Sequence, residues 1–207
     1  MIKNIIFDLG NVIIDLDIQR TEIAFQALLG EKYQQTLQGL QLQDIFEQYE
    51  TGKVTEDTFI STLQQSTSHD VSAEAIKTAW NAMLLGIPPQ RFEMLLRLKQ
   101  QYAVFLLSNT NQTHLDCVYQ YLIKTYNVTD FETRYFHKAY YSHLVQLRKP
   151  NVDIYEYVLQ DANILASESV FIDDVAANIE GANLAGIHTI HHKVGAEIVT
   201  VMDGYLA

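Results

Sequence analysis

Polar residues suited to phosphate chemistry follow apolar runs at several separate places in this chain. The first is Asp8, which comes directly after Ile5, Ile6 and Phe7. Runs of β-branched and aromatic residues are typical of short buried strands. Ligands of parallel sheets bind at the carboxyl ends of the strands, so a carboxylate placed there is a candidate nucleophile or metal ligand. Three further segments of this kind are Ser108-Asn109-Thr110-Asn111, Arg148-Lys149-Pro150-Asn151 and Phe171-Ile172-Asp173-Asp174.

If the fold brings these segments together, the charges decide the chemistry. Asp8, Asp173 and Asp174 would share one edge of the sheet, and two unit charges about 4 Å apart repel by roughly 4 kcal/mol at an intermediate dielectric. Three carboxylates therefore require a cation or a bound proton. An all-oxygen ligand set favours a hard ion, with Mg²⁺ as the expected cofactor. Lys149 and Ser108 add donors for phosphate oxygens, which completes a predicted phosphoryl-transfer site.

The elements that must position these residues alternate after Pro89. The pattern predicts helices over 90–101, 112–125, 151–161 and 175–185, with a short terminal helix. It predicts strands over 102–107, near 135–140, over 169–172 and near 188–192. Strands that alternate with helices indicate an α/β fold, a parallel sheet with helices on both faces.

The segment after the first strand is different. It is rich in Gln, Glu, Ala and Leu, and helices are expected over 18–29, 34–50, 55–65 and 72–84. Thr55, with acids directly after it, predicts a helix start. We therefore expect a core domain of residues 1–15 and 87–207, and a helical cap of residues 16–86 inserted at the edge where the site lies, as a lid would be.

Composition narrows the class of partner. The chain has 207 residues, 48% of them apolar, enough for one core with a small insert. A net charge of −11 argues against a nucleic-acid partner, while a small anionic ligand needs only a few local donors. No run of apolar residues is long enough to cross a membrane, and no signal peptide is evident. Cys117 is the single cysteine, so a cytoplasmic location is expected. The oligomeric state is not predicted.

On these residues the chain resembles the haloacid dehalogenase (HAD) superfamily of aspartyl-phosphate phosphohydrolases. The four segments given above correspond to the four motifs of this family and occur in the same order. The last one continues with Asn178, Gly181 and Ala182, and the resemblance covers nearly the whole chain. The resemblance implies a Rossmann-like core with a small helical-bundle cap. Within the family, the sequence looks most like bacterial α-D-glucose 1-phosphate phosphatases. The expected substrate is therefore a small phosphate ester, a sugar phosphate such as a hexose 1-phosphate.

The resemblance also implies roles for single residues. Asp8 attacks phosphorus and becomes an aspartyl phosphate, and Lys149 bridges Asp8 and the phosphate. The metal ligands are Asp8, the carbonyl of Gly10 and Asp174, with Asp173 as an outer or alternate ligand. The residues expected to bind phosphate oxygens are Ser108, Asn109, Leu9, Gly10 and Lys149.

One departure concerns the acid that the family usually carries two residues after the nucleophile. Here that position is Gly10. General acid–base help is typically worth about 10²–10⁴ in rate, so good leaving groups are expected to be favoured. Asp17 or a water is a hypothetical substitute. Two alternatives stay open: a 2-haloacid dehalogenase, which needs no metal, and a phospholigand-binding or regulatory protein with weak turnover.

Overall fold

The structure is a computed structural model that describes residues 1–30, 33–34, 40–66 and 70–206, with side chains at 40–44 left undescribed. Of the helix predicted over 34–50, the described part is α3 (Leu40–Glu50), and residues 35–39 lie outside the described ranges. Within those ranges no helix combines the length and apolar character that crossing a membrane requires.

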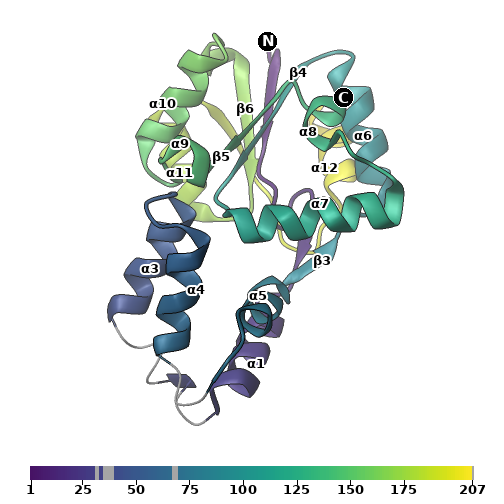
Figure 1. Ribbon diagram of the computed structural model, residues 1–207. Coiled ribbons are helices and arrows are strands. Elements are labelled where there is room, and N and C mark those ends of the chain that lie inside the picture. Colours follow the sequence, from purple (N-terminus) through teal and green to yellow (C-terminus); the bar gives the residue numbers. More distant parts are fainter. Residues whose placement is uncertain (31–32, 35–39, 67–69, 207) are drawn as a thin grey trace.

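A five-stranded parallel sheet forms the centre of the fold (Figure 1). Its order is β5-β4-β1-β6-β7, so the first strand of the chain lies in the middle. The strands are β1 (Asn4–Phe7), β4 (Ala103–Ser108), β5 (Lys138–Tyr141), β6 (Ser169–Asp173) and β7 (His188–His191). The predicted α/β class is confirmed. The strand expected near 135–140 begins later, because 131–135 forms a short helix, α8 (Phe131–Tyr135).

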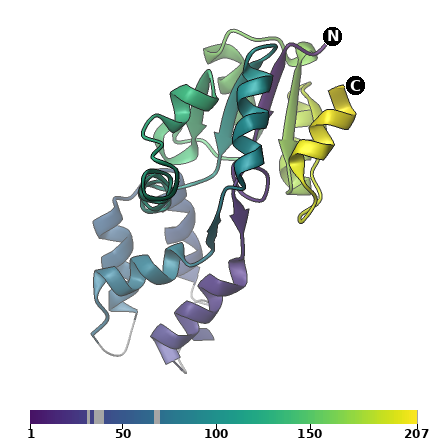
Figure 2. The same cartoon turned by 90° about the vertical axis from the view of Figure 1, so that its right-hand side faces the viewer.

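Helices cover both faces of this sheet (Figures 1 and 2). Successive side chains of a strand point to opposite faces. Accordingly Ile5 and Phe7 join the core on one face, and Ile6 joins the core on the other. The first core includes residues of α6 (Pro89–Lys99), α7 (Gln112–Tyr126), α8 and α12 (Ile198–Leu206), and the second includes residues of α10 (Val152–Asp161) and α11 (Ala176–Leu184).

A separate group of helices, which we call the helical group, packs around its own apolar cluster. It comprises α1 (Ile18–Leu29), α3, α4 (Glu56–Gln65) and α5 (Ala73–Asn81). Phe59 is fully buried in this cluster, and its ring lies 5.3 Å from that of Trp80. Thr55 caps α4 by accepting a hydrogen bond from the Thr58 amide, so the predicted helix start is confirmed.

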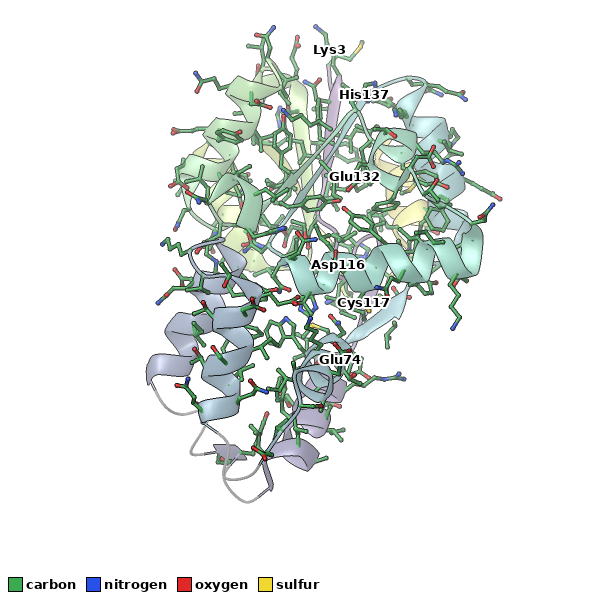
Figure 3. The ribbon with its side chains drawn as sticks, viewed as in Figure 1. Lys3, Glu74, Asp116, Cys117, Glu132 and His137 are labelled. Atoms are coloured by element: carbon green, nitrogen blue, oxygen red, sulfur yellow. The ribbon has the colours of Figure 1, made fainter. Side chains whose placement is uncertain are left out.

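A short antiparallel ribbon joins the helical group to the sheet (Figure 2). It pairs β2 (Asp15–Leu16) with β3 (Leu84–Gly86). The helix predicted over 72–84 therefore ends earlier than expected, at Asn81. Helix α7 lies between the sheet and the helical group, and Figure 3 labels Asp116 and Cys117 on it. Cys117 lines a small cavity there together with Leu84 and Tyr121.

Candidate active site

The register of the sheet places two acids side by side. Phe7 of β1 pairs with Ile172 of β6, so the next residues on the two strands, Asp8 and Asp173, are neighbours. The Asp8 amide also donates to the Ile172 carbonyl at 2.9 Å, which extends the pairing to the end of β1. Parallel strands in register thus bring together two carboxylates that lie far apart in the sequence.

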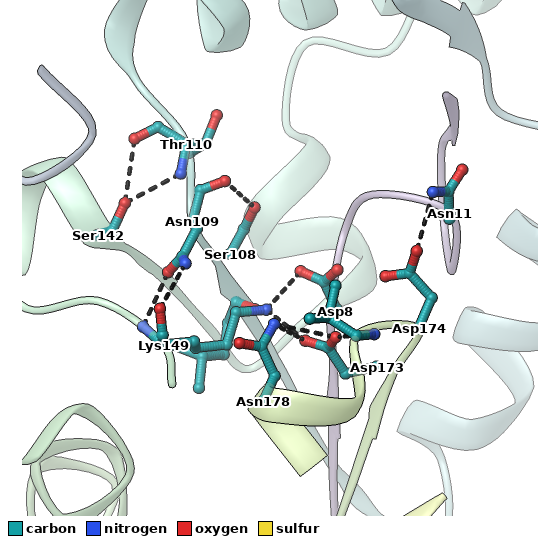
Figure 4. Close-up of polar contacts among 12 residues, drawn as sticks. Asp8, Asn11, Ser108, Asn109, Thr110, Ser142, Lys149, Asp173, Asp174 and Asn178 are labelled. Carbon is teal, nitrogen blue, oxygen red and sulfur yellow. Dashed lines mark hydrogen bonds and ion pairs between the residues drawn. The ribbon is translucent and has the colours of Figure 1, made fainter. Parts of the chain in front are cut away.

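Lys149 connects these acids (Figure 4). Its Nζ donates to Asp8 Oδ1 at 2.7 Å, to Asp173 Oδ2 at 2.6 Å and to the Leu107 carbonyl at 3.0 Å. Its side chain is 1% exposed. Burial disfavours a charged lysine, but the two carboxylates outweigh this and hold the pKa of Lys149 above its ordinary value. The ammonium is therefore held in its charged form.

Burial raises the pKa of Asp8 to about 7, with Lys149 opposing the change and Asp173 adding to it. Two buried acids share one ammonium, so negative charge remains in excess. Asp174 is the next residue and adds a third carboxylate. Ligand atoms of Asp8, Asp173 and Asp174 all lie within 4.8 Å of one another. Such a set of hard oxygen donors fits a divalent cation like Mg²⁺.

The carboxylates of the three acids differ in how many hydrogen bonds they already accept from the protein. Asp173 is fully buried and accepts from Lys149, from Asn178 Nδ2 at 3.0 Å on both oxygens, and from the Val175 amide at 2.8 Å. Asp174 accepts from Asn11 Nδ2 at 2.9 Å through one oxygen only. The free lone pairs therefore belong mainly to Asp8 and Asp174, and Asp173 acts chiefly on the position of Lys149.

The two phosphate-binding residues predicted at the end of β4, Ser108 and Asn109, also lie here, but their side chains differ in whether they can bind a ligand. Ser108 is buried, and among the described residues its hydroxyl contacts only the Asn109 carbonyl, at 3.5 Å, so it is available to a ligand. The side chain of Asn109 is already used. Its Nδ2 donates to the Lys149 carbonyl at 2.9 Å and its Oδ1 accepts from the Lys149 amide at 3.0 Å. Asn109 therefore fixes the Lys149 segment, and only its backbone amide remains for a phosphate.

These residues surround one cavity of about 320 Å³. Its lining includes every predicted site residue except Asp173, which is fully buried. Other lining residues come from the helical group and the ribbon, and they include Leu16, Ile18, Glu50, Trp80, Met83 and Leu84. The cavity thus has a polar base at the strand ends and a second wall made by the helices.

The position that lacks the usual acid is filled by a neighbour. A Cβ built at Gly10 would lie 2.7 Å from Leu16 Cδ1, so Leu16 occupies the space next to residue 10. The proposed substitute, Asp17, is not among the lining residues, and its carboxylate accepts from Arg20 Nε at 3.2 Å at the surface. The hypothesis that Asp17 replaces the acid is therefore not supported.

Several residues of the site were not predicted from the sequence. Asn11 positions Asp174, and Asn178 positions Asp173. Glu50 and His114 line the cavity. Asn178 was visible as part of the fourth motif, whereas Glu50 and His114 have no local signal because their place depends on how the helical group packs against α7.

The chain is similar to known proteins over most of its length. Residues 5–192 match the family model of the haloacid dehalogenase-like hydrolases. The chain is 30% identical to a D-ribitol-5-phosphate phosphatase of Bacteroides thetaiotaomicron, over 95% of this chain and 95% of that protein. A sesquiterpene phosphatase of Aspergillus oryzae is 27% identical over 91% of this chain and 89% of its own. The chain belongs to the haloacid dehalogenase-like hydrolase family and is similar over most of its length to phosphatases of that family.

Solved structures agree with this assignment. A HAD-family enzyme of Bacteroides thetaiotaomicron, in complex with magnesium and inorganic phosphate, is 33% identical, with a TM-score of 0.84 over 97% of this chain and 99% of its own. A HAD-like hydrolase of Porphyromonas gingivalis is 29% identical, with a TM-score of 0.88 over 100% and 98%. An L-2-haloacid dehalogenase is 15% identical at a TM-score of 0.62, which shows a shared fold alone.

Proposed function

We propose that the chain is a Mg²⁺-dependent phosphatase that hydrolyses a small phosphate ester through an aspartyl phosphate on Asp8. The observation that carries this proposal is the 2.7 Å contact between Asp8 and Lys149 in a cavity that Ser108 and Asp174 also line. The substrate class is a sugar-type phosphate. A hexose 1-phosphate was expected from the sequence, and the name of the Bacteroides relative adds sugar-alcohol phosphates to this class.

Each residue has a definite task in this reaction. The Asp8 carboxylate attacks phosphorus, the bond from phosphorus to the ester oxygen breaks, and the alcohol leaves after taking a proton from water. A second water then hydrolyses the aspartyl phosphate, which releases inorganic phosphate and restores the Asp8 carboxylate. The Ser108 hydroxyl donates to phosphate oxygens, together with the backbone amides of Leu9, Gly10 and Asn109. Lys149 Nζ attracts the phosphate through its charge, because its three hydrogens are donated to Asp8, Asp173 and the Leu107 carbonyl. Because these donors are held by the sheet and by buried hydrogen bonds, they need little rearrangement as charge develops on the phosphate.

The metal would be held by Asp8, Asp174 and the carbonyl of Gly10. Mg²⁺ at this position would offset the excess negative charge and allow the anionic substrate to come near Asp8. Asn11 fixes one oxygen of Asp174 and so helps to set its direction. Asp173 holds Lys149 rather than the ion, because its oxygens already accept hydrogen bonds from several donors.

The helical group would serve as the cap. We assign residues 16–86 to this domain and residues 1–15 and 87–207 to the core, since the apolar cluster of the helical group is separate from those of the sheet. The boundary crosses the ribbon of β2 and β3. A reducing compartment such as the cytoplasm suits the free thiol of Cys117.

The experiment is a phosphate-release assay over sugar, sugar-alcohol and nucleoside monophosphates, with p-nitrophenyl phosphate as a general reporter. With Mg²⁺ the wild-type protein is expected to release phosphate, and Asp8→Asn to lose activity on the order of 10³-fold or more. A chelator should abolish the activity. Halide release from a 2-haloacid without metal would instead show a dehalogenase. Silence with p-nitrophenyl phosphate and Mg²⁺ would show a binding protein.

A further inference from the structure

The lining of the cavity contains a histidine with a defined tautomer. His114 lies on the first turn of α7, and its ring stacks on Trp80 of the helical group with centroids 4.9 Å apart and planes 11° apart. His114 Nδ1 lies 2.8 Å from Asn81 Oδ1. An amide oxygen only accepts hydrogen bonds, so Nδ1 carries the hydrogen and Nε2 holds a lone pair.

The second nitrogen of this ring is free to meet a ligand. His114 Nε2 makes no hydrogen bond with any described residue, and it is not among the buried side-chain atoms that lack a partner. It therefore keeps accessible surface, and His114 lines the cavity. Burial lowers the pKa of His114 to about 4, so the ring is neutral near pH 7. A neutral ring with its only hydrogen engaged offers the cavity a hydrogen-bond acceptor.

A second acceptor in the lining of the cavity is Glu50, at the end of α3. One of its oxygens accepts from Arg148 Nη2 at 3.1 Å, and the other makes no hydrogen bond with a described residue. Arg148 is also paired with Glu47 at 2.9 Å, so its charge is offset by two carboxylates. The Arg148–Glu50 pair therefore presents an acceptor to the cavity rather than a free cation.

We propose that His114 and Glu50 are the specificity-determining residues of this enzyme and accept hydrogen bonds from hydroxyl groups of a polyhydroxylated leaving group. This inference rests on the proposed phosphatase function and assigns two residues of the cavity to recognition of the sugar or sugar-alcohol part of its substrate. Two acceptors select hydrogen-bond donors. An apolar alcohol leaves both acceptors unpaired on binding, and a leaving group with its own carboxylate meets the charge of Glu50.

The test compares two primary phosphate esters with the same number of carbons, ribitol 5-phosphate and 1-pentyl phosphate. The measured quantity is the ratio of their kcat/KM values with Mg²⁺. The ratio is expected to favour ribitol 5-phosphate by about a hundredfold in the wild-type protein, since a site built for hydroxyls rejects an analogue that lacks them. His114→Phe keeps the stacking on Trp80 but removes the Nε2 acceptor. Glu50→Gln replaces the second acceptor, a carboxylate, with an amide, which is a weaker one. Each is expected to lower the ratio about tenfold.

Controls separate hydrogen bonding from altered folding. His114→Gln restores a side-chain acceptor and should recover part of the ratio. His188→Phe and Glu156→Gln change exposed residues that are not part of the lining and should leave the ratio unchanged. Melting temperatures of all variants show whether each one folds.

The outcomes distinguish the two proposals. Phosphate release from p-nitrophenyl phosphate combined with a wild-type ratio near one would overturn the inference and leave the phosphatase intact. A ratio that His114→Phe and Glu50→Gln do not change would also overturn it. No release from any ester would overturn the phosphatase function, and the inference with it.

Discussion

The side chain of Leu16 fills the space into which a side chain at residue 10 would project, since a Cβ at Gly10 would lie 2.7 Å from Leu16 Cδ1. Residue 10 is where the family usually carries its general acid. Because Gly10 has no side chain, Leu16 can occupy the space beside it. An acid at residue 10 therefore requires the end of the Leu16 side chain to shift.

The first prediction follows from this pairing. Gly10→Asp alone should increase turnover less than Gly10→Asp/Leu16→Ala, because the Leu16 side chain has to shift to make room for the acid. Gly10→Asp/Leu16→Ala is expected to hydrolyse an alkyl phosphate at least about tenfold faster than Leu16→Ala, at the low end of what general acid catalysis supplies. The measurement is kcat for 1-pentyl phosphate beside p-nitrophenyl phosphate, whose leaving group needs little protonation. A double variant no faster than Leu16→Ala on the alkyl ester would contradict the prediction.

Lys149→Met should strongly destabilise the fold. The substitution leaves Asp8 and Asp173 buried beside each other without the ammonium, and breaking a buried ion pair typically costs about 3–5 kcal/mol. Urea unfolding at pH 7.5 without metal measures the loss. The matched control is Lys138→Met, which removes a surface pair with Asp161 and should cost under about 1 kcal/mol. Equal stability of the two variants would show that Lys149 does not hold the acids together.

Gly181 is expected to be necessary for the position of Lys149. A Cβ at Gly181 would lie 2.1 Å from the carbonyl oxygen of Pro150, so α11 could not pack on the residue that follows Lys149. Gly181→Ala should therefore cost roughly 1–3 kcal/mol of stability and also reduce phosphate release. Gly204→Ala is the control, because nothing lies within 4 Å of that Cβ and alanine favours the helix. A Gly181→Ala protein with wild-type activity and stability would rule out the close contact.

The low pKa of His114 predicts a pH dependence of stability. The folded state binds its proton only near pH 4, whereas the unfolded chain binds it near pH 6.5. Between these values the unfolded state holds more protons, so stability falls as pH decreases from 6.5 to 4. His114→Phe should reduce this loss by up to about 2 kcal/mol. Urea unfolding at pH 4.5 and 7.5 tests the prediction, with His188→Phe as the control. An unchanged pH slope in His114→Phe would show that this ring is not held neutral.

Much of the fold and site was predictable because the signals are local. Ile5–Phe7 and Phe171–Ile172 are short apolar runs followed by acids, and sheet register then aligns Asp8 with Asp173. The β2–β3 ribbon was missed because two- and three-residue strands show no alternation. Glu50 and His114 were missed for another reason. Their place in the cavity depends on the packing of α3 and α5 against α7, which sequence spacing does not encode.

The covalent intermediate on Asp8 is the most direct test of the account. Wild-type protein would be mixed with Mg²⁺ and p-nitrophenyl phosphate, quenched in acid within the first turnover, digested and analysed by mass spectrometry. The account predicts one added phosphoryl group on the peptide that contains Asp8, and none in Asp8→Asn. Phosphate release without a modified Asp8 peptide, or with the phosphoryl group on another residue, would contradict it.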